Sequence, residues 1–271
     1  MRRSARLFCL LGLLALLGGA AGCNEDDDEF LLIPIADEFG FTGSFGNSGD
    51  EAVDYLSNSP FTSLAVEIDV IDFKPGNGAD EVDPSTINLL DTRLTDRCNK
   101  PVGINVFTND LIPTSSPLFR TVYTIQDLIN IENAHRTFQD TSNQKTLYII
   151  VVNGDSEFDD QNQKVLGLAF SASSIAIFRE NIEDVAPLPK AANIPAIENS
   201  VYVHEAGHNL GLVNNGINMV TQHEDPDHQH HDINSNCVMF FAVEAGLGIS
   251  TPPNDFDQNC INDMVNVGGK P

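Results

Sequence analysis

The chain has 271 residues, of which 41% are hydrophobic, so it can bury the core of one large domain or of two small ones. It contains 14 basic and 39 acidic residues, and the formal net charge is −25. This charge argues against nucleic acid as a partner, because nucleic-acid binding requires a basic surface.

Residues 1–22 have the composition of a secretory signal peptide. Arginines precede an apolar run from Leu7 to Leu17, which is too short to span a bilayer. The sequence AAGC that follows resembles a bacterial lipobox, although Ala20 stands where leucine is more usual. The resemblance implies cleavage before Cys23 and lipidation of this cysteine. We therefore expect a membrane anchor in the bacterial envelope, on the periplasmic or outer-surface side, with plain secretion as the alternative.

Residues 23–60 are predicted to form a flexible tether. They contain the acidic run NEDDDE and the Gly- and Ser-rich segment FGFTGSFGNSGD. Segments of this composition do not bury enough apolar surface to offset their ordering entropy. The folded domain is therefore expected to span residues 61–271.

The first part of this domain is predicted to alternate between strands and helices. Val66, Ile68 and Val70 alternate with acidic residues, as in a half-buried strand. Helical spacing follows an N-cap at Asp83 or Ser85. The other predicted segments are strands at 102–107, 146–152, 165–170 and 173–178 and a helix within 124–138.

A long helix then contains the segment VYVHEAGHNLGLVNNG. Pro195 suits its first turn, and Gly211 suits its end in the left-handed conformation. The tail from residue 212 to 271 shows little periodicity, and we expect a metal to organise it. The predicted fold class is α+β, with a twisted mixed sheet, backing helices, one site-bearing helix and an irregular C-terminal part.

His204, Glu205 and His208 form the pattern H-E-x-x-H in this helix. Because an α-helix advances about 100° per residue, both histidines lie on one face and reach one ion. Glu205 stands beside that face, where it can accept a proton from a water that the metal activates for attack on a peptide carbonyl. All histidines except His135 lie between residues 204 and 231, which also favours zinc.

The third metal ligand is not given by this motif. Asn214 stands where one large group of zinc proteases has its third histidine, and a neutral amide is a weaker zinc ligand than imidazole. His231 is our first candidate and His223 the second, because imidazole is a preferred third ligand. Other candidates in the same segment are Glu224, Asp225 and His228.

The pattern H-E-x-x-H-x-x-G with a later methionine resembles the metzincin clan of zinc metallopeptidases. Its archaemetzincin branch continues from the third histidine as H-C-x4-C-x-M, and this chain has His231-Asp232-x4-Cys237-Val238-Met239. The resemblance implies that residues 214–230 are an insertion, that His231 binds Zn²⁺ with the two helix histidines, and that Met239 packs beneath the metal as the Met-turn residue.

Three departures from the archaemetzincin pattern limit this resemblance. Asp232 replaces the first cysteine of the pattern. Of the later C-x-x-C, only Cys260 is present. A second metal site of the family is therefore expected to be lost. Phe241 replaces a tyrosine found in some metzincins near the oxyanion. The partners of Cys98, Cys237 and Cys260 stay open, with at most one disulfide among the three.

The sequence thus predicts a zinc metalloendopeptidase that acts on proteins or peptides and is attached to a membrane through an N-terminal lipid. The alternative is a non-catalytic envelope lipoprotein that binds metal through the segment HEDPDHQHH. A decayed protease serving as an adhesion module is a third hypothesis, against which the intact Glu205 argues.

Overall fold

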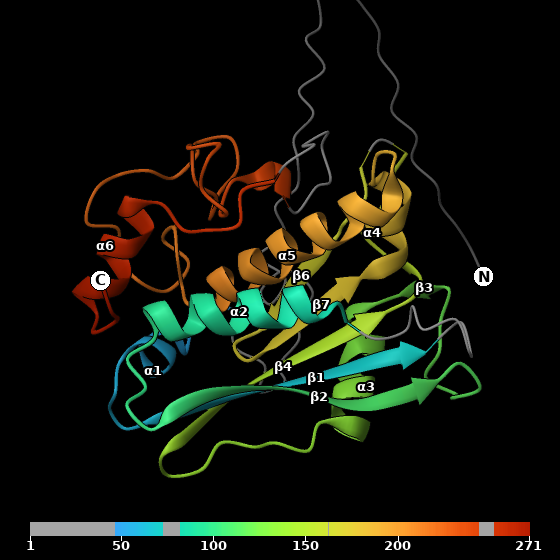
Figure 1. Ribbon diagram of the computed structural model, residues 1–271, viewed down its shortest axis with the longest axis horizontal. Coiled ribbons are helices and arrows are strands. Elements are labelled where there is room, and N and C mark those ends of the chain that lie inside the picture. Colours follow the sequence, from blue (N-terminus) through green and yellow to red (C-terminus); the bar gives the residue numbers. More distant parts are fainter. Residues whose placement is uncertain (1–46, 73–81, 162, 244–251) are drawn as a thin grey trace, which may run out of the picture. The chain divides into compact units, whose positions relative to one another are not determined.

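The protein is built on a five-stranded sheet. A computed structural model describes residues 47–72, 82–161, 163–243 and 252–271. The order of the strands is β2-β1-β4-β7-β6 (Figure 1). The strands are β1 (Ser63–Asp72), β2 (Gly103–Pro113), β4 (Gln144–Val152), β6 (Gly167–Ser171) and β7 (Ser174–Phe178). β6 is antiparallel to β7 and the other neighbours are parallel, which confirms the predicted mixed sheet.

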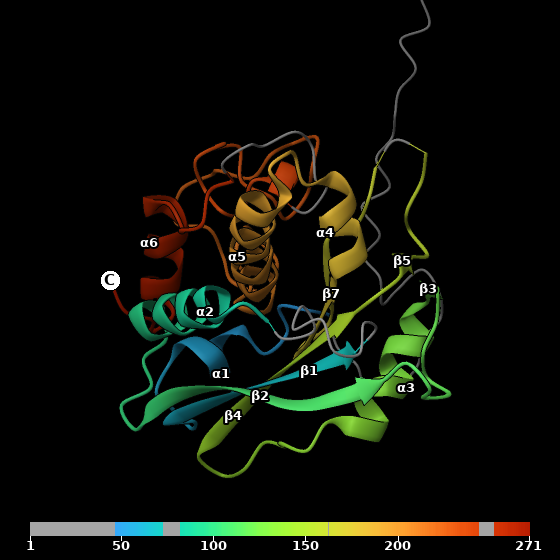
Figure 2. The same ribbon diagram turned by 45° about the vertical axis from the view of Figure 1, so that its right-hand side comes forward.

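Helices cover both faces of the sheet (Figure 2). α2 (Pro84–Arg97) and α5 (Lys190–Asn209) lie on one face, and α3 (Ile125–His135) lies on the other. Successive residues of β4 enter the two cores in turn: Ile149 packs in the core of α2 and α5, and Ile150 packs in the core of α3. The predicted backing helices are therefore confirmed.

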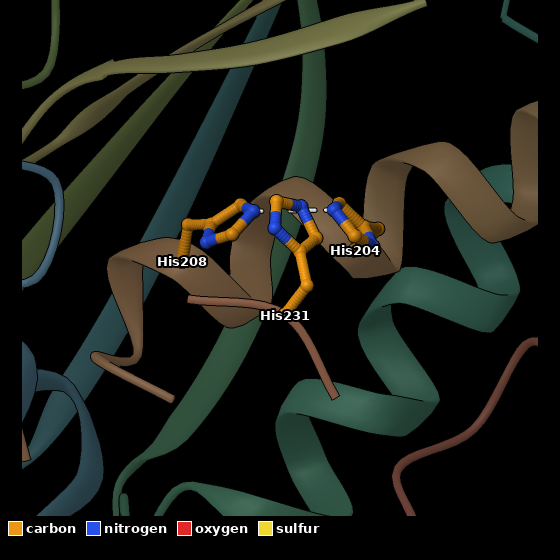
Figure 3. A group of neighbouring side chains, drawn as sticks. All are labelled: His204, His208 and His231. Atoms are coloured by element: carbon orange, nitrogen blue, oxygen red, sulfur yellow. Dashed lines mark hydrogen bonds between the residues drawn. The ribbon is translucent and has the colours of Figure 1, made fainter. Parts of the chain in front are cut away.

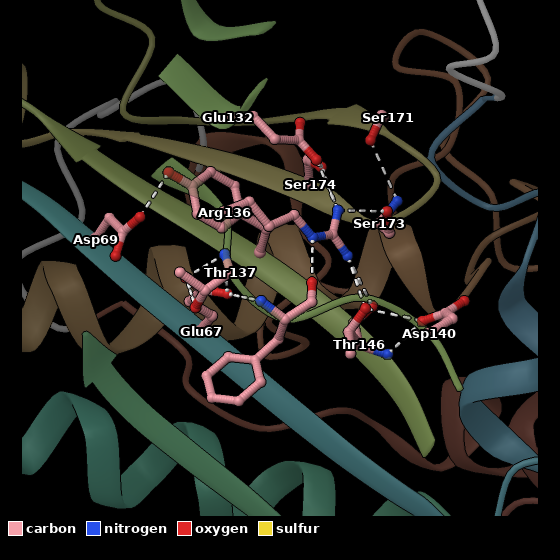
Figure 4. Close-up of polar contacts among 12 residues, drawn as sticks. Glu67, Asp69, Glu132, Arg136, Thr137, Asp140, Thr146, Ser171, Ser173 and Ser174 are labelled. Atoms are coloured by element: carbon pink, nitrogen blue, oxygen red, sulfur yellow. Dashed lines mark hydrogen bonds and ion pairs between the residues drawn. The ribbon is translucent and has the colours of Figure 1, made fainter. Parts of the chain in front are cut away.

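β1 is more buried than its sequence predicted. Its alternation indicated a half-buried strand, but Glu67 and Asp69 are both fully buried. Glu67 accepts hydrogen bonds from the backbone N–H groups of Thr137 and Phe138, at 2.9 and 2.7 Å (Figure 4). The expectation was wrong because α3 and its following loop cover this face and supply the donors that buried carboxylates need.

Arg136, the residue after α3, fastens this helix to the sheet (Figure 4). Its Nη1 donates to Glu132 Oε1 at 2.6 Å and to Ser173 Oγ at 3.0 Å. Its Nη2 donates to Thr146 Oγ1 at 2.8 Å. A carboxylate and two hydroxyls thus compensate the burial of the guanidinium, and the core on this side contains a connected polar network.

The other elements are short. They are α1 (Ala52–Leu56), β3 (Val122–Tyr123), β5 (Asp155–Ser156), α4 (Arg179–Val185), the 3₁₀ helix η1 (Phe241–Val243) and α6 (Gln258–Asn266). β3 and β5 pair in parallel as a separate two-stranded sheet. Over the described ranges, no helix combines the length and apolarity needed to cross a bilayer.

The folded part of the chain begins earlier than residue 61. Residues 1–46, which include the predicted signal peptide and Cys23, lie outside the described residues. Residues 47–60 were predicted as tether, but α1 buries Ala52, Tyr55 and Leu56 in the core. Tyr55 also donates its hydroxyl hydrogen to the carbonyl of Thr146 at 2.9 Å. The prediction was wrong because these three side chains, at helical spacing, follow directly on a Gly- and Ser-rich segment.

Two predictions for the C-terminal part were also wrong. α5 begins at Lys190, so Pro195 lies inside the helix rather than in its first turn, and the intrahelical hydrogen bond of that position is lost. The tail is mostly irregular, as predicted, but α6 forms near its end, where the Asp257 carboxylate caps the backbone N–H groups of Asn259 and Cys260. Extensive burial of α5 and this cap explain why both helices form.

The environment of Asp69 leads to a prediction about pH. Burial raises the pKa of Asp69 to about 6, although hydrogen bonds from Tyr148 and the Asp110 backbone oppose the shift. The folded protein therefore holds a proton that the unfolded chain releases near pH 4, so this group lowers stability as pH rises from about 4 to 6. We expect Asp69→Asn to remove this slope and to gain roughly 2 kcal/mol or more at pH 7.

Urea unfolding of both proteins from pH 4 to 7 measures this difference. Asp110→Asn, at a more exposed carboxylate nearby, is the control and is expected to retain most of the slope, because the charge of Asp110 makes only a small contribution to the raised pKa of Asp69. A gap between wild type and Asp69→Asn that stays constant across this pH range would contradict the prediction.

Candidate metal centre

Two histidines lie side by side on α5. Because His204 and His208 are one helical turn apart, their rings face the same side, and the two Nε2 atoms are 3.1 Å apart (Figure 3). Both side chains are buried. The H-E-x-x-H segment therefore places two imidazoles at one point in the interior, as its helical spacing predicted.

α5 ends so that the chain can turn back toward these rings. Its last residue is Asn209, and Gly211 follows with φ +72°. A Cβ at Gly211 would lie 2.6 Å from the Cβ of Ala52 in α1, so glycine is required both for its backbone and for its size. The predicted end of the helix at Gly211 is confirmed.

The segment after α5 is a hairpin-like excursion that returns at His231. Asn214 is exposed, with φ 62°, and lies outside the histidine cluster. Glu224 and Asp232 form an antiparallel bridge, and the Ile233 N–H donates to the carbonyl of His223 at 2.9 Å. The chain therefore turns back between Glu224 and Asp232 and leaves His231 beside α5.

His231 completes a group of three buried imidazoles (Figure 3). Its ring centroid lies 5.2 Å from that of His204 and 5.1 Å from that of His208. One ring nitrogen of each histidine lies within 4.8 Å of the others. The structure thus brings together the three residues that the sequence selected as ligands.

Backbone carbonyls orient two of these rings. His204 Nδ1 lies 2.6 Å from the carbonyl oxygen of Val238, and His231 Nδ1 lies 2.8 Å from that of Gln229. A carbonyl only accepts, so each Nδ1 carries the hydrogen and each Nε2 keeps its lone pair. Metal-binding histidines commonly have this outer contact, which fixes the ring and its tautomer.

The donor set fits zinc. Ligand nitrogens about 2.1 Å from one tetrahedral ion lie about 3.4 Å from one another, and the Nε2 atoms of the two helix histidines are 3.1 Å apart. Three imidazoles leave one tetrahedral position for a further ligand, as in catalytic zinc sites. His204, His208 and His231 are therefore the residues that would hold the ion.

Glu205 lies between the histidine helix and the sheet. Its side chain is 1% exposed, and a Cβ at Gly167, the first residue of β6, would lie 2.6 Å from Glu205 Cγ and Oε1. The missing side chain of Gly167 thus makes room for the carboxylate. The role of this glycine was not predicted from the sequence, although a glycine in a strand often marks a close approach.

Met239 packs beneath the histidine turn. It is fully buried, and a Cβ at Gly207 would overlap with Met239 Sδ and lie 3.1 Å from Phe256. The contact therefore places Met239 against the turn that links His204 to His208, which agrees with the position that the resemblance implied.

His223, the alternative third ligand, lies in a different group. Its Nδ1 is 2.7 Å from Asp232 Oδ2, and its Nε2 is 2.8 Å from Asp263 Oδ2. Burial lowers the pKa of His223, but the hydrogen bonds to the two carboxylates outweigh it and raise the pKa to about 9. Both nitrogens then carry hydrogens and neither has a lone pair for a metal.

The other candidates of this segment contact one another. His228 Nδ1 lies 2.9 Å from Asp225 Oδ2, and its ring stacks on Phe241 with centroids 3.6 Å apart. Glu224 Oε1 accepts from the backbone N–H of His230 at 2.9 Å. These side chains are therefore engaged in shaping the hairpin and lie outside the triad of imidazoles.

Comparison with known proteins gives partial structural likenesses. No protein-family model and no curated protein matches the chain. The crystal structure of archaemetzincin from Methanopyrus kandleri aligns with 76% of this chain and 95% of its own at 14% identity, with a TM-score of 0.46. Archaemetzincin from Archaeoglobus fulgidus, complexed with malonate, aligns with 74% of this chain and 99% of its own at 16% identity, with a TM-score of 0.42. A zinc-dependent peptidase from Methanocorpusculum labreanum aligns with 74% of this chain and 99% of its own at 12% identity, with a TM-score of 0.44. At this degree of overlap, the function has to be inferred from the side chains of this chain.

Removal of the third imidazole is expected to weaken metal binding. We expect His231→Ala to lower zinc affinity at least 100-fold, because the ion is then bound by two histidine nitrogens and water in place of three fixed histidine nitrogens. His230→Ala, next to it but half-exposed, is the matched control and is expected to bind one zinc as the wild type does. Competition with a chromogenic chelator measures both affinities; equal affinities in the two variants would exclude His231 as a ligand.

The contact between Gly207 and Met239 predicts a packing defect. We expect Gly207→Ala to lower the free energy of unfolding by about 1–3 kcal/mol, because the added methyl group overlaps with a buried thioether. In the double variant Gly207→Ala/Met239→Ala the loss should be smaller than the sum of the two single losses, because the shortened side chain leaves room for the methyl group. Denaturant unfolding of the four proteins tests this, and additive losses would show that the two residues do not interact.

Proposed function

We propose that this protein is a zinc-dependent peptidase. The observation that carries the proposal is the convergence of His204, His208 and His231 at one buried point, with Glu205 on the same helix. Three imidazoles with a neighbouring carboxylate are the groups that metal-assisted peptide hydrolysis requires. The fold and the positions of the residues support this function over simple metal storage, because storage has no need for Glu205.

Each residue has a defined task in this proposal. The three histidines bind the ion through their Nε2 atoms, and the carbonyls of Val238 and Gln229 hold two of the rings in place. Zinc, when bound, supplies Lewis-acid activation of water and of the peptide carbonyl. Glu205 accepts the proton from the attacking water and returns it to the leaving amine.

The edge of the sheet supports an extended peptide as substrate. β6 is the last strand in the sheet order, so one of its edges pairs with no strand among the described residues. Its first residue, Gly167, contacts Glu205. An extended chain that hydrogen-bonds to this edge would therefore pass close to the general base, in the manner of β-strand addition.

We also propose the lipid anchor at Cys23, which rests on the N-terminal sequence alone. A peptidase held in this way would act on proteins at the surface of a membrane. The alternative function as a metal buffer through HEDPDHQHH loses support, because three histidines of this segment, His223, His228 and His230, contact carboxylates of the chain.

Glu205→Gln separates catalysis from metal binding. We expect this variant to bind one zinc with wild-type affinity and to lose at least 1000-fold in kcat/KM on a peptide library, because an amide cannot accept the proton. Glu180→Gln, at an exposed carboxylate on α4, is the control and is expected to keep full activity. Zinc content and cleavage rates are measured on the same preparations. Cleavage by Glu205→Gln at the wild-type rate would disprove the mechanism, and absence of cleavage by wild-type protein with one bound zinc would favour a non-catalytic role.

A further inference from the structure

A second cluster of polar side chains lies beside the histidines. Ligand atoms of His223, Asp232, Asp257 and Cys260 gather within 4.8 Å of one another. Cys237 adjoins this cluster, with its Sγ 3.7 Å from the Sγ of Cys260. Such a group suggests either a second metal site or a different use of the two thiols.

Hydrogen bonds within the protein already occupy the polar groups of this cluster. His223 donates from both nitrogens and so offers no lone pair. Asp257 Oδ1 accepts from two backbone N–H groups at the start of α6, and Oδ2 accepts from Asn234 Nδ2 at 2.9 Å. Asp232 Oδ1 accepts from the Asn234 N–H at 2.7 Å. A metal ion would have to disrupt several of these contacts, whereas the two thiols have only weak ones.

The thiols are placed to react with each other. Cys237 and Cys260 are both fully buried, and they belong to different segments, the turn before Met239 and helix α6. A disulfide requires the sulfurs, now 3.7 Å apart, to approach to about 2.05 Å. Cys98, the third described cysteine, is also buried, and burial raises its pKa to about 12. The hydrogen bond with Cys237 and burial likewise raise the pKa of Cys260 well above its ordinary value, so the folded protein disfavours the thiolate at both positions, and the short distance between Cys237 and Cys260 is what selects this pair.

We propose that Cys237 and Cys260 form a disulfide in the exported protein, and that this covalent link takes the place of a second metal ion. It fastens α6 to the segment that carries Val238, whose carbonyl orients His204. The proposal is independent of peptidase activity. It requires the oxidising compartment that the signal sequence predicts.

The oxidant is a disulfide, either of an envelope thiol oxidoreductase or of oxidised glutathione. One cysteine thiolate attacks the oxidant's S–S bond, which forms a mixed disulfide and releases one thiol. The second thiolate then attacks the chain's sulfur in the mixed disulfide and displaces the second thiol. The new S–S bond replaces the oxidant's, and two electrons and two protons leave in the two thiols. Because both sulfurs are buried, oxidation precedes the final packing of α6.

Peptide mapping of the full-length exported chain tests the proposal. The protein is denatured with a first alkylating reagent, then reduced and treated with a second, and each cysteine is identified by mass spectrometry. We expect the second label on Cys237 and Cys260, the first label on Cys98, and a linked 237–260 peptide pair in the unreduced digest. The proposal is overturned if Cys98 is in the disulfide, or if Cys237 and Cys260 carry the first label, with or without a second zinc in the native protein.

Thermal unfolding supplies a second measurement. We expect reduction to lower the Tm of wild type and of the control Cys98→Ala by about 5–10 °C, because the link between residues 237 and 260 restricts the unfolded chain. Cys237→Ala/Cys260→Ala should show no effect of reductant. An equal effect of reductant in this variant would contradict the proposal, and if the variant does not fold, the peptide map of the wild type decides.

Discussion

The hydrogen bond between His204 and the carbonyl of Val238 is the interaction on which the arrangement of the site depends. It joins the regular part of the protein, through α5, to the irregular segment that follows the hairpin. The same segment brings Met239 against Gly207, so one stretch of chain both orients a ring and supports the helical turn below it. The irregular tail is thereby held to α5 at the point where the imidazoles meet.

The sheet supplies the rigid base for this arrangement. α5 lies on it and is tied at two points: Arg179 of α4 pairs with Glu198, near the middle of the helix, at 3.1 Å, and Asn209 Nδ2, at its end, donates to the carbonyl of Ser171 in β6 at 2.8 Å. On the opposite face, the Arg136 network fixes α3 without using any residue of the site. The histidines therefore project from a helix that the sheet and α4 hold in place, which suits a site whose geometry is set before an ion binds.

The sequence predicted those parts of the structure that depend on local periodicity. The strand at 146–152 is mostly apolar, and the helix after Asp83 begins with a clear side-chain cap, so both patterns survived in the fold. The predictions failed where distant contacts decide: α1 forms because α5 ends above Ala52, and Glu67 is buried because the loop after α3 supplies donors. The two helix histidines followed from spacing alone, and the resemblance to archaemetzincins ranked His231 before His223. That Asp232 and Asp263 engage His223 became evident only in the structure, because no local pattern brings these carboxylates together.

The hairpin that precedes His231 has a consequence for how proteins of this kind are found. The bridge between Glu224 and Asp232 encloses His231 and Gln229, whose carbonyl orients the ring, so a change in length that leaves the imidazole in place belongs in the chain between α5 and Glu224. Lengthening a closed loop is inexpensive, since each doubling of the residue number costs only about 0.6 kcal/mol. A search that demands a constant interval between the second and third histidines would discard this chain, although the coordination geometry is present. Spatial templates of three rings and one carboxylate are the better filter for detecting such an arrangement of side chains.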